Sequence, residues 1–254
     1  MAALFLDESL DPARLVPGAL VQLGGAEAHH AVAVSRLRPG ERVRVGDGSG
    51  TIAEGVVEST GRDELSVRVE RVRHEPEPSP RIVLVQALAK GDRDELAVQA
   101  ACEVGVDAVV PWQAERSVSR WSGPKAERGV ERWRAIVREA SKQSLRSRVP
   151  EVRPLEDTAA LVWRTAAAQA SRTLVLDPDA ERPLSRVGAT LAAESDAVEE
   201  VILVVGPEGG IAPGELERLE QAGAIPVRLG PGVLRTSTAG PVAVGLLHLL
   251  LGRW

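Results

Sequence analysis

The sequence predicts an α/β protein in two parts, a small N-terminal β-barrel and a larger domain in which strands and helices alternate. Three observations support this prediction. Short segments of alternating polarity fill residues 1–73, three prolines stand within 75–80, and apolar strands separated by helices occupy the rest. Alternation with a period of two is typical of half-buried strands, whereas strands that alternate with helices indicate a mostly parallel sheet.

Five short strands and one helix are expected within residues 1–73. The clearest turn between them is Gly46-Asp47-Gly48-Ser49-Gly50, because glycine and aspartate favour tight turns. His29 and His30 fall in the expected helix, where adjacent side chains point about 100° apart, so a structural role is favoured over a catalytic or RNA-binding one. The expected strands are 3–6, 19–23, 41–45, 51–58 and 64–71, and the expected helix is 25–37.

Residues 74–80 are expected to form a linker, because their prolines cannot continue a strand or a helix. The larger domain is then expected to span 81–254. Its first helix begins near Asp92 and Glu95, which have a capping-box-like spacing, and stops at Gly105. The expected strands are 81–88, 107–111, 173–177, 201–205 and 227–229, and the expected helices are 92–104, 126–146, 213–222 and 238–251.

The composition excludes several classes of protein. Cys102 is the only cysteine, and the four histidines lack the spacing of metal ligands, so neither a disulfide framework nor a metal is expected. No apolar run reaches the roughly 18 residues of a membrane span, and the N-terminal residues lack the features of a signal peptide. A cytoplasmic protein with no membrane partner is therefore expected.

The excess positive charge is concentrated in one segment. The formal net charge is −5, yet residues 116–153 contain 11 lysine and arginine residues and four aspartate and glutamate residues. A local patch can bind polyanions even on an acidic protein, because salt screens charges beyond about 8 Å. Phosphate binding and an ordinary solvated face are the two interpretations. The cations that recur every fourth residue of the expected helix 126–146, and would share one face, are Arg134, Arg138, Lys142 and Arg146.

Two glycine-rich loops follow the last two expected strands. The first is Gly206-Pro207-Glu208-Gly209-Gly210, and the second is 230–238. Ligands of open α/β sheets bind at the carboxyl ends of the strands, so the two loops are expected to share one site. Neither loop has the spacing of a phosphate-binding or dinucleotide-binding motif, and Glu208 would repel a phosphate. A positively charged cofactor fits better, and two ordinary structural turns are the alternative.

These loops resemble the cofactor site of a known family. The segments Val205-Gly206-Pro207-Glu208-Gly209-Gly210-Ile211 and Leu229-Gly230-Pro231-Gly232-Val233-Leu234-Arg235-Thr236-Ser237-Thr238-Ala239 are similar to those of the bacterial 16S ribosomal RNA uridine N3-methyltransferases, a family of the SPOUT superfamily. Further similar segments are His29-His30, 36–41, 87–93, 103–106, Glu115-Arg116-Ser117 and Arg132-Trp133, with Glu139-Ala140 and Gln143-Ser144. The resemblance covers nearly the whole chain and departs from the family at Lys142, Leu145, Gly232 and Ser237.

The resemblance implies an N-terminal PUA-like β-barrel that binds RNA and a C-terminal SPOUT α/β trefoil-knot methyltransferase domain. It implies an S-adenosyl-L-methionine-dependent rRNA (uridine-N3) methyltransferase that acts, as a homodimer, on one uridine in the decoding region of 16S rRNA in the small ribosomal subunit. The residues expected to hold S-adenosyl-L-methionine are Leu203, Gly206, Pro207, Glu208, Gly209, Gly210, Leu229, Gly230, Leu234, Thr236, Ser237, Thr238 and Ala239.

Arg235 is the candidate catalytic residue. Methyl transfer from a sulfonium is an in-line displacement in which alignment and charge stabilisation dominate. The uracil N3 must lose its proton, and the planar donors of Arg235 can hold the resulting negative charge; a salt bridge to Glu208 or across a dimer is the structural alternative. The proton acceptor is open among Glu139, Glu208 and water. The candidate RNA-binding residues are Lys90, Arg93, Arg116, Arg134, Arg138, Lys142 and Arg146.

Other functions remain as alternatives. Methylation of transfer RNA or of a ribose hydroxyl by the same knotted fold is the nearest one, and a non-catalytic RNA-binding module belongs to a different class. A dinucleotide-dependent oxidoreductase fits least, because the glycine fingerprint is missing. The expected closing helix 238–251 is apolar on every side, and such a helix must be covered on every side, which agrees with a homodimer.

Overall fold

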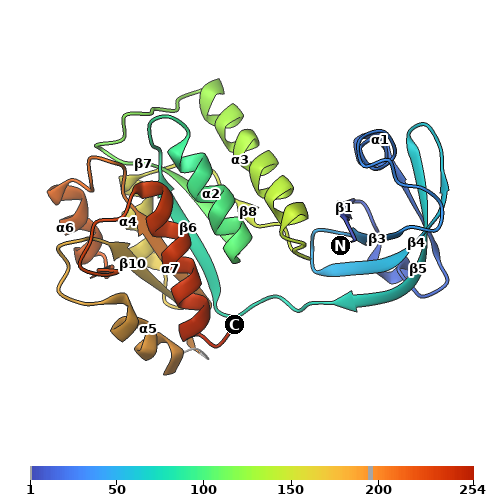
Figure 1. The fold of residues 1–254 in the computed structure, drawn as a ribbon. Helices are drawn as coiled ribbons and strands as arrows, with labels where there is room; N and C mark the ends of the chain where they lie inside the picture. The colour runs from blue at the N-terminus through green and yellow to red at the C-terminus, as the bar shows by residue number, and fades with distance from the viewer. Residues whose placement is uncertain (1, 194–196) are drawn as a thin grey trace. The chain divides into compact units, whose positions relative to one another are not determined.

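The structure is a computed structural model that describes residues 2–193 and 197–254. The chain divides into two compact units (Figure 1). The first, which we call the barrel unit, consists of Met1–Glu77 and Ser141–Val149. The second, which we call the parallel-sheet unit, consists of Pro78–Ala140 and Pro150–Trp254.

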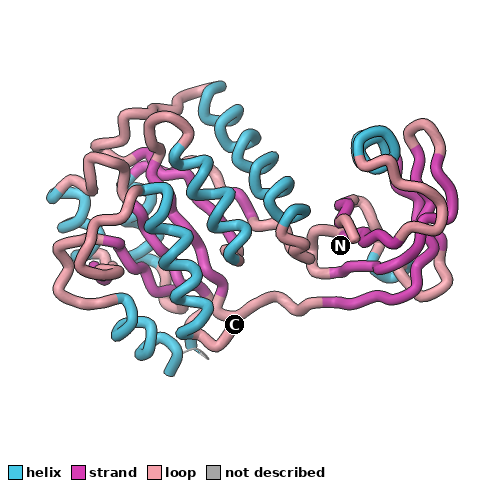
Figure 2. Tube along the Cα trace, viewed as in Figure 1, coloured by secondary structure: helices cyan, strands magenta, loops and turns pink. Residues whose placement is uncertain are grey.

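A curled five-stranded sheet forms the barrel unit (Figure 2). Its strands are β1 (Leu4–Leu6), β2 (Leu20–Gly24), β3 (Arg42–Gly46), β4 (Thr51–Thr60) and β5 (Glu64–His74). They follow the order β1-β3-β4-β5-β2, and all neighbours are antiparallel except β1 and β3. Two irregularities in the β4–β5 pairing increase the twist. Gly55 stands at one of them, where an added Cβ would lie 2.2 Å from the Arg68 carbonyl oxygen.

The alternation of the sequence places one face of this sheet in the core. In β2, for example, Val21 and Leu23 are buried while the intervening residues are exposed. Between β2 and β3 lie α1 (Gly25–His29) and a π-helical turn, η2 (His30–Val34), so the helical segment is shorter than the expected 25–37. A second apolar cluster joins residues 141–149 to the unit, because Leu145 and Val149 pack against buried residues of β1 and β4.

The sheet of the second unit is parallel throughout and has the order β12-β10-β11-β6-β7-β8, with β9 also paired to β7. The central strands β11 and β6 are fully flanked, which explains their nearly continuous apolar sequences. The strands are β6 (Arg81–Ala87), β7 (Ala108–Gln113), β8 (Glu151–Val152), β9 (Glu156–Asp157), β10 (Ser171–Leu176), β11 (Glu200–Val205) and β12 (Ile225–Val227).

Helices cover both faces of the parallel sheet (Figure 1). They are α2 (Arg93–Val104), α3 (Pro124–Gln143), α4 (Thr158–Ala167), α5 (Leu184–Ala193), α6 (Pro213–Gln221) and α7 (Thr236–Leu250). On one face α7 packs against α2, β6 and β11, and an added Cβ at Gly240 would lie 3.1 Å from Leu84. On the other face Leu161 of α4 and Leu219 of α6 join the cluster that contains Val83 and Val85. The expected barrel followed by a parallel α/β domain is confirmed.

Several local expectations were wrong. The helix at 126–146 ends at Gln143, because Leu145 adopts a left-handed φ of 58° that no helix continues. Asp92 also has a left-handed φ, of 57°, and its side chain makes no capping hydrogen bond, so the expected capping box with Glu95 is not formed. The short strands β8 and β9 and the helices α4 and α5 lie in 151–193, where no element except β10 was expected. Among the described residues, no helix is both long and apolar enough to cross a membrane.

Candidate functional site

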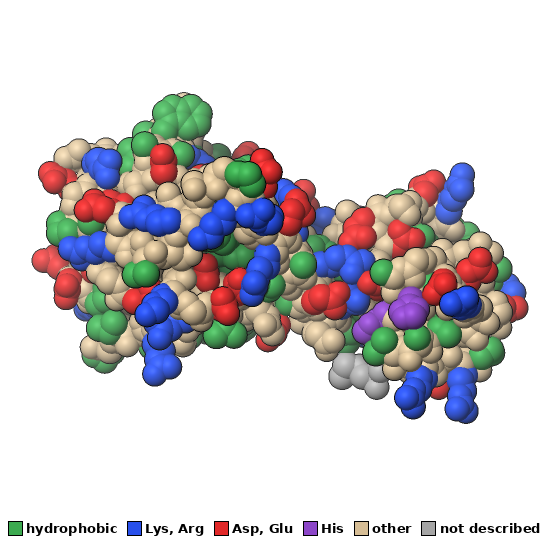
Figure 3. All heavy atoms as spheres, turned by 90° about the horizontal axis from the view of Figure 1, so that it is seen from above, with side chains coloured by type: hydrophobic (Ala, Val, Ile, Leu, Met, Phe, Trp, Pro, Cys, Tyr) green, Lys and Arg blue, Asp and Glu red, His purple; other side chains and the backbone are tan. Residues whose placement is uncertain are grey.

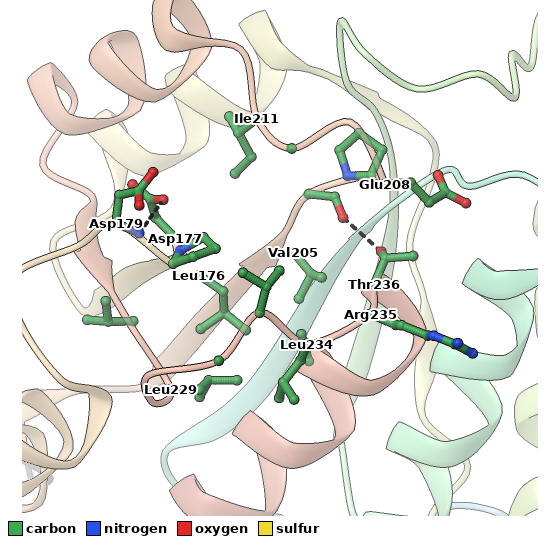
Figure 4. Close-up of a pocket in the computed structure, with 18 of the residues that line it drawn as sticks. Leu176, Asp177, Asp179, Val205, Glu208, Ile211, Leu229, Leu234, Arg235 and Thr236 are labelled. Atoms are coloured by element: carbon green, nitrogen blue, oxygen red, sulfur yellow. Dashed lines mark hydrogen bonds between the residues drawn. The ribbon is translucent and has the colours of Figure 1, made fainter.

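A cavity of about 640 Å³ opens at the carboxyl ends of β10, β11 and β12 (Figure 4). Three loops enclose it, one after each strand, and the start of α7 closes one side. This is the edge where open parallel sheets bind their ligands. The residues that line the cavity are Arg93, Arg116, 176–179, 205–208, Gly210, Ile211, Leu216, Val227, Leu229, Gly230, 232–236 and Ala239.

The two glycine loops are tied together at the floor of the cavity. The Thr236 hydroxyl donates to the Gly206 carbonyl oxygen at 2.8 Å, which Figure 4 shows as a dashed line. The buried Gln86 side chain of β6 donates to the same hydroxyl at 2.9 Å. Gly206 cannot be replaced without movement, because an added Cβ would lie 2.7 Å from Ile211. The loops are therefore held in shape before any ligand binds.

Most residues that the sequence predicted for the cofactor line this cavity. They are Gly206, Pro207, Glu208, Gly210, Leu229, Gly230, Leu234, Thr236 and Ala239. Four others do not line it. Leu203 is buried within β11, Gly209 lies against Arg116, and Ser237 and Thr238 are in the first turn of α7.

One wall of the cavity and its main anchor were not predicted from the sequence. The missed wall is the loop after β10, where the Asp177 carboxylate accepts a hydrogen bond of 3.1 Å from the Asp179 backbone N–H. Both aspartates lie on the same side of the cavity in Figure 4. The strand β10 was expected from the sequence. Because ligands bind at the carboxyl ends of parallel strands, the residues that follow β10 could have been predicted to line the cavity. The missed anchor is Glu215 of α6, a buried carboxylate whose helix was expected but whose contacts were not.

Glu208 fixes the first glycine loop to the start of α2. Its Oε1 accepts hydrogen bonds from the Lys90 backbone N–H at 3.1 Å and from Arg93 Nη1 at 2.9 Å. Burial alone would raise the pKa of Glu208, but hydrogen bonds from its own backbone N–H, from Arg93 and from Lys90 outweigh burial and lower that pKa. Glu208 is therefore a stable carboxylate at neutral pH and a weak base.

Three arginines line the cavity, and their side chains are engaged differently. Arg93 pairs with Glu208, and Arg116 donates to the Gly209 carbonyl oxygen at 3.0 Å. For Arg235 no side-chain hydrogen bond or ion pair is found among the residues that the structure describes. Its side chain is exposed and points away from Asp177 and Asp179 in Figure 4. The expected alternative of a bridge to Glu208 is not formed, because Arg93 occupies that carboxylate.

The other predicted basic residues lie in α3 or just after it, and they differ in exposure and in their partners. Arg134 is exposed and pairs with Glu131, and Arg138 pairs with Glu139 at 3.6 Å. Lys142 is buried and pairs with Glu27 at 3.0 Å inside the barrel unit, and Arg146 lies beyond the end of α3. Arg134, Arg138 and Lys142 keep the four-residue spacing within α3, but the expected basic face is not continuous, because Lys142 is buried and Arg146 lies outside the helix. RNA binding by these residues stays a prediction. On the face of the parallel-sheet unit seen in Figure 3, basic side chains are interspersed with acidic ones.

Asp94, near the start of α2, is a buried carboxyl with an unusual ionisation. Only 5% of the residue is exposed, and burial raises its pKa from 3.8 to about 6, although backbone N–H groups at Ala89 and Glu95 act in the opposite direction. The raised folded-state pKa means that the fold favours the protonated acid. The associated stability is complete below about pH 4 and is lost as the pH rises through 6, by about 3 kcal/mol in total.

We therefore expect Asp94→Asn to raise the free energy of unfolding by up to about 3 kcal/mol at pH 8 and to change it little at pH 4, because the amide carries no charge to desolvate. Urea unfolding followed by circular dichroism at the two pH values measures this difference. Asp92→Asn, at an exposed neighbour, is the matched control and should show no such pH dependence. An equal effect of Asp94→Asn on the free energy of unfolding at both pH values would contradict a raised pKa of Asp94.

The fold and the cavity together indicate the class of protein, and two families of known proteins match the chain. The RNA methyltransferase domain family matches residues 75–248, and the RNA methyltransferase PUA domain family matches residues 23–70. The protein is thus an RNA methyltransferase by class, with the PUA-like barrel and SPOUT-type α/β domain expected from the resemblance.

The chain belongs to the family of ribosomal RNA small subunit methyltransferase E. It is 46% identical to the Mycobacterium tuberculosis protein of that name, over 93% of this chain and 89% of the relative. It is 31% identical to the Bacillus subtilis protein, over 85% and 84% of the two chains. The crystal structure of the Neisseria gonorrhoeae protein bound to S-adenosyl methionine has a TM-score of 0.83 and 25% identity, covering 98% of both chains.

Proposed function

We propose that this protein transfers a methyl group from S-adenosyl-L-methionine to N3 of a specific uridine in the decoding region of 16S rRNA. One observation carries the proposal. The two family-specific glycine loops, joined through Thr236, form a preshaped cavity of about 640 Å³ at the carboxyl edge of the sheet. A relative with the same fold is described with S-adenosyl methionine bound.

The residues of the cavity fit this cofactor. S-adenosyl-L-methionine is cationic at its sulfonium and carries no phosphate, and Glu208, Asp177 and Asp179 provide carboxylates in the cavity wall. Backbone groups of Gly206, Gly210, Leu229 and Leu234 would hold the adenosine and methionine parts, with the Asp177 and Asp179 carboxylates available to hydroxyl and amino groups. A polyphosphate would be repelled by the same acids.

The chemical step needs little beyond alignment and charge stabilisation. When bound, the cofactor supplies an activated methyl group: the N3–CH3 bond forms as the S–CH3 bond breaks, and the N3 proton leaves to a base. The negative charge of the deprotonated uracil spreads onto its carbonyl oxygens. Arg235 is the arginine of the cavity wall whose guanidinium has no acceptor among the described residues, so it is the one available to receive that charge.

Of the candidate proton acceptors, water fits best. Glu208 has a lowered pKa, and its Oε1 already accepts two hydrogen bonds. Glu139 pairs with Arg138 on α3 and is not among the residues lining the cavity. Neither carboxylate is therefore poised to take a proton from a uracil beside the cofactor.

The test of this function is nucleoside mass spectrometry. Small-subunit rRNA from a strain that lacks the modification is incubated with the protein and S-adenosyl-L-methionine, then digested. We expect 3-methyluridine at one position. Methylated transfer RNA, a methylated ribose, or cofactor binding without transfer to any RNA would each overturn the proposal, and the last outcome would leave a non-catalytic RNA-binding module.

The homodimer is part of the same proposal. α7 buries one side against α2 and the sheet, and its other side leaves Val242 and Leu249, seven residues apart, exposed. We expect a dimer in sedimentation equilibrium at micromolar concentration, and we expect Leu249→Glu to shift it to a monomer. Trp163→Glu is the matched control, because Trp163 is equally apolar and exposed but lies on α4, on the opposite face of the sheet. A monomeric parent protein would contradict the prediction.

A further inference from the structure

A second cavity, of about 440 Å³, lies beside the cofactor cavity within the parallel-sheet unit. The segment from Ala89 into the first turn of α2 forms one wall, and the segment from Val118 into the first three turns of α3 forms the other. The two cavities share a boundary, because Lys90 lines the second cavity while its backbone N–H donates to Glu208, which lines the first. Its volume is in the range of sites for small ligands or single residues of a polymer.

The rim of this cavity carries positive charge that the protein does not neutralise. Lys125 and Arg128 are both exposed, and within 2–193 and 197–254 neither side chain has an ion pair or hydrogen-bond partner. Arg132 is different, because both of its donors contact Glu95, at 2.7 Å each, and the pair neutralises itself. Lys125 and Arg128 are thus the cations available to an outside anion.

The same cavity is also lined by two acids, exposed Asp92 and buried Asp94, and by a fixed aromatic ring. Asp92 and the buried Asp94 present carboxyl groups, which accept hydrogen bonds from hydroxyl and amino groups. Trp121 forms the back wall: it packs edge-on against Trp133 at 5.7 Å, and an added Cβ at Gly129 would lie 2.6 Å from its ring. A cavity lined by both cations and carboxyl groups matches a nucleotide better than a bare phosphate, since a nucleotide has an anionic phosphate and a sugar or base with hydrogen-bond donors.

We propose that this second cavity binds one nucleotide of the RNA substrate next to the target uridine, with Lys125 and Arg128 on its phosphate and Asp92 and Asp94 facing its ribose or base edge. The inference rests on the proposed function, because the RNA strand must pass the cofactor cavity to be methylated. Contacts of this kind, to phosphate, 2′-hydroxyl and base edge, are how proteins hold unpaired RNA. The cavity replaces the helical face at Arg138, Lys142 and Arg146 as the expected RNA path.

The test is the salt dependence of RNA binding by the full chain. In Lys125→Ala/Arg128→Ala, we expect affinity for unmodified small-subunit rRNA to fall about tenfold and the slope of log affinity against log salt to decrease by roughly 0.7–1.4, which corresponds to one or two lost contacts to a single strand. KM for RNA should rise while kcat stays near that of the parent. Calorimetric binding of S-adenosyl-homocysteine should not change.

Arg182→Ala/Arg186→Ala is the matched control, because it also removes two exposed charges from the parallel-sheet unit, at and before α5 and away from both cavities. It should leave the salt slope unchanged. An unchanged slope in Lys125→Ala/Arg128→Ala would overturn the proposal, and so would micromolar binding of free uridine 5′-monophosphate that this variant alone abolishes without altering RNA binding. Absence of methyl transfer by the parent protein would instead count against the proposed function.

Discussion

Replacing Glu215 with alanine is expected to lower the free energy of unfolding by about 3–5 kcal/mol and to abolish measurable cofactor binding. The Glu215 carboxylate is only 1% exposed and serves three donors. Its Oε1 accepts from the Glu115 backbone N–H at 2.9 Å and from the Thr158 hydroxyl, and its Oε2 accepts from the Ala212 backbone N–H at 3.3 Å. Alanine would leave the Thr158 hydroxyl and the Ala212 N–H buried without this acceptor, at about 1–3 kcal/mol each, and would also remove the acceptor of the Glu115 N–H.

The loss should reach the cofactor because of where the three donors lie. Ala212 ends the first glycine loop, Glu115 precedes Arg116 in the cavity wall, and Thr158 begins α4 and also accepts a hydrogen bond from the buried Trp112 indole. Glu215 therefore joins three segments around the cavity. The carboxylate that accepts from Ala212 is the half of a capping box that remains when the N-cap residue is alanine.

Urea unfolding and calorimetric titration with S-adenosyl-homocysteine measure the two effects. Glu215→Gln is the matched control, because the amide keeps one acceptor oxygen for Glu115 and Thr158 and loses only the contact to Ala212. It should cost about 1–2 kcal/mol and retain cofactor binding. If the alanine and glutamine variants have the same free energy of unfolding, the hydrogen bonds of Glu215 do not stabilise the segments around the cavity.

Much of the fold could be predicted because local pattern and tertiary context agree. The apolar strands β6 and β11 and the glycine loops that follow β11 and β12 were all expected from the sequence. Residues 206–210 and 229–236 lie at one edge because carboxyl ends of parallel strands meet there. What could not be predicted depends on side chains far apart in the chain, such as Glu215 with Glu115 or Gln86 with Thr236.

Helix α3 shows why a four-residue spacing of cations does not by itself predict a continuous exposed basic face. The four-residue spacing of Arg134, Arg138, Lys142 and Arg146 does place cations on one side of an ideal helix, but spacing does not reveal where the helix stops or which cation is buried. The helix α3 ends before Leu145, which has a left-handed φ, and Lys142 forms an ion pair with Glu27, more than a hundred residues earlier in the chain. Lys125 and Arg128, which have no ion pair among the described residues, lie at the other end of α3 and were not predicted to bind RNA.

The largest functional effect is expected at Arg235. Arg235→Ala should leave the fold and cofactor binding intact but lower the methylation rate by roughly 10²–10³, the scale for losing one preorganised donor at a developing anion. Stability should hold because Arg235 is exposed and its guanidinium contacts no acceptor in the described chain. Only its backbone carbonyl is used, as an acceptor for the first turn of α7.

Single-turnover methyl transfer at saturating cofactor and RNA, paired with calorimetric binding of S-adenosyl-homocysteine, separates this role from its alternatives. Arg235→Lys should recover only part of the rate, because a point ammonium cannot present two parallel donors to the uracil. Arg116→Ala is a useful comparison: it also removes an arginine from the cavity wall, but that arginine already donates to Gly209, so its loss should weaken cofactor binding more than the chemical step. If Arg235→Ala transfers methyl at the parent rate, or loses stability and cofactor together, the anion is stabilised elsewhere, with Arg93 and Lys90 as the next residues to test.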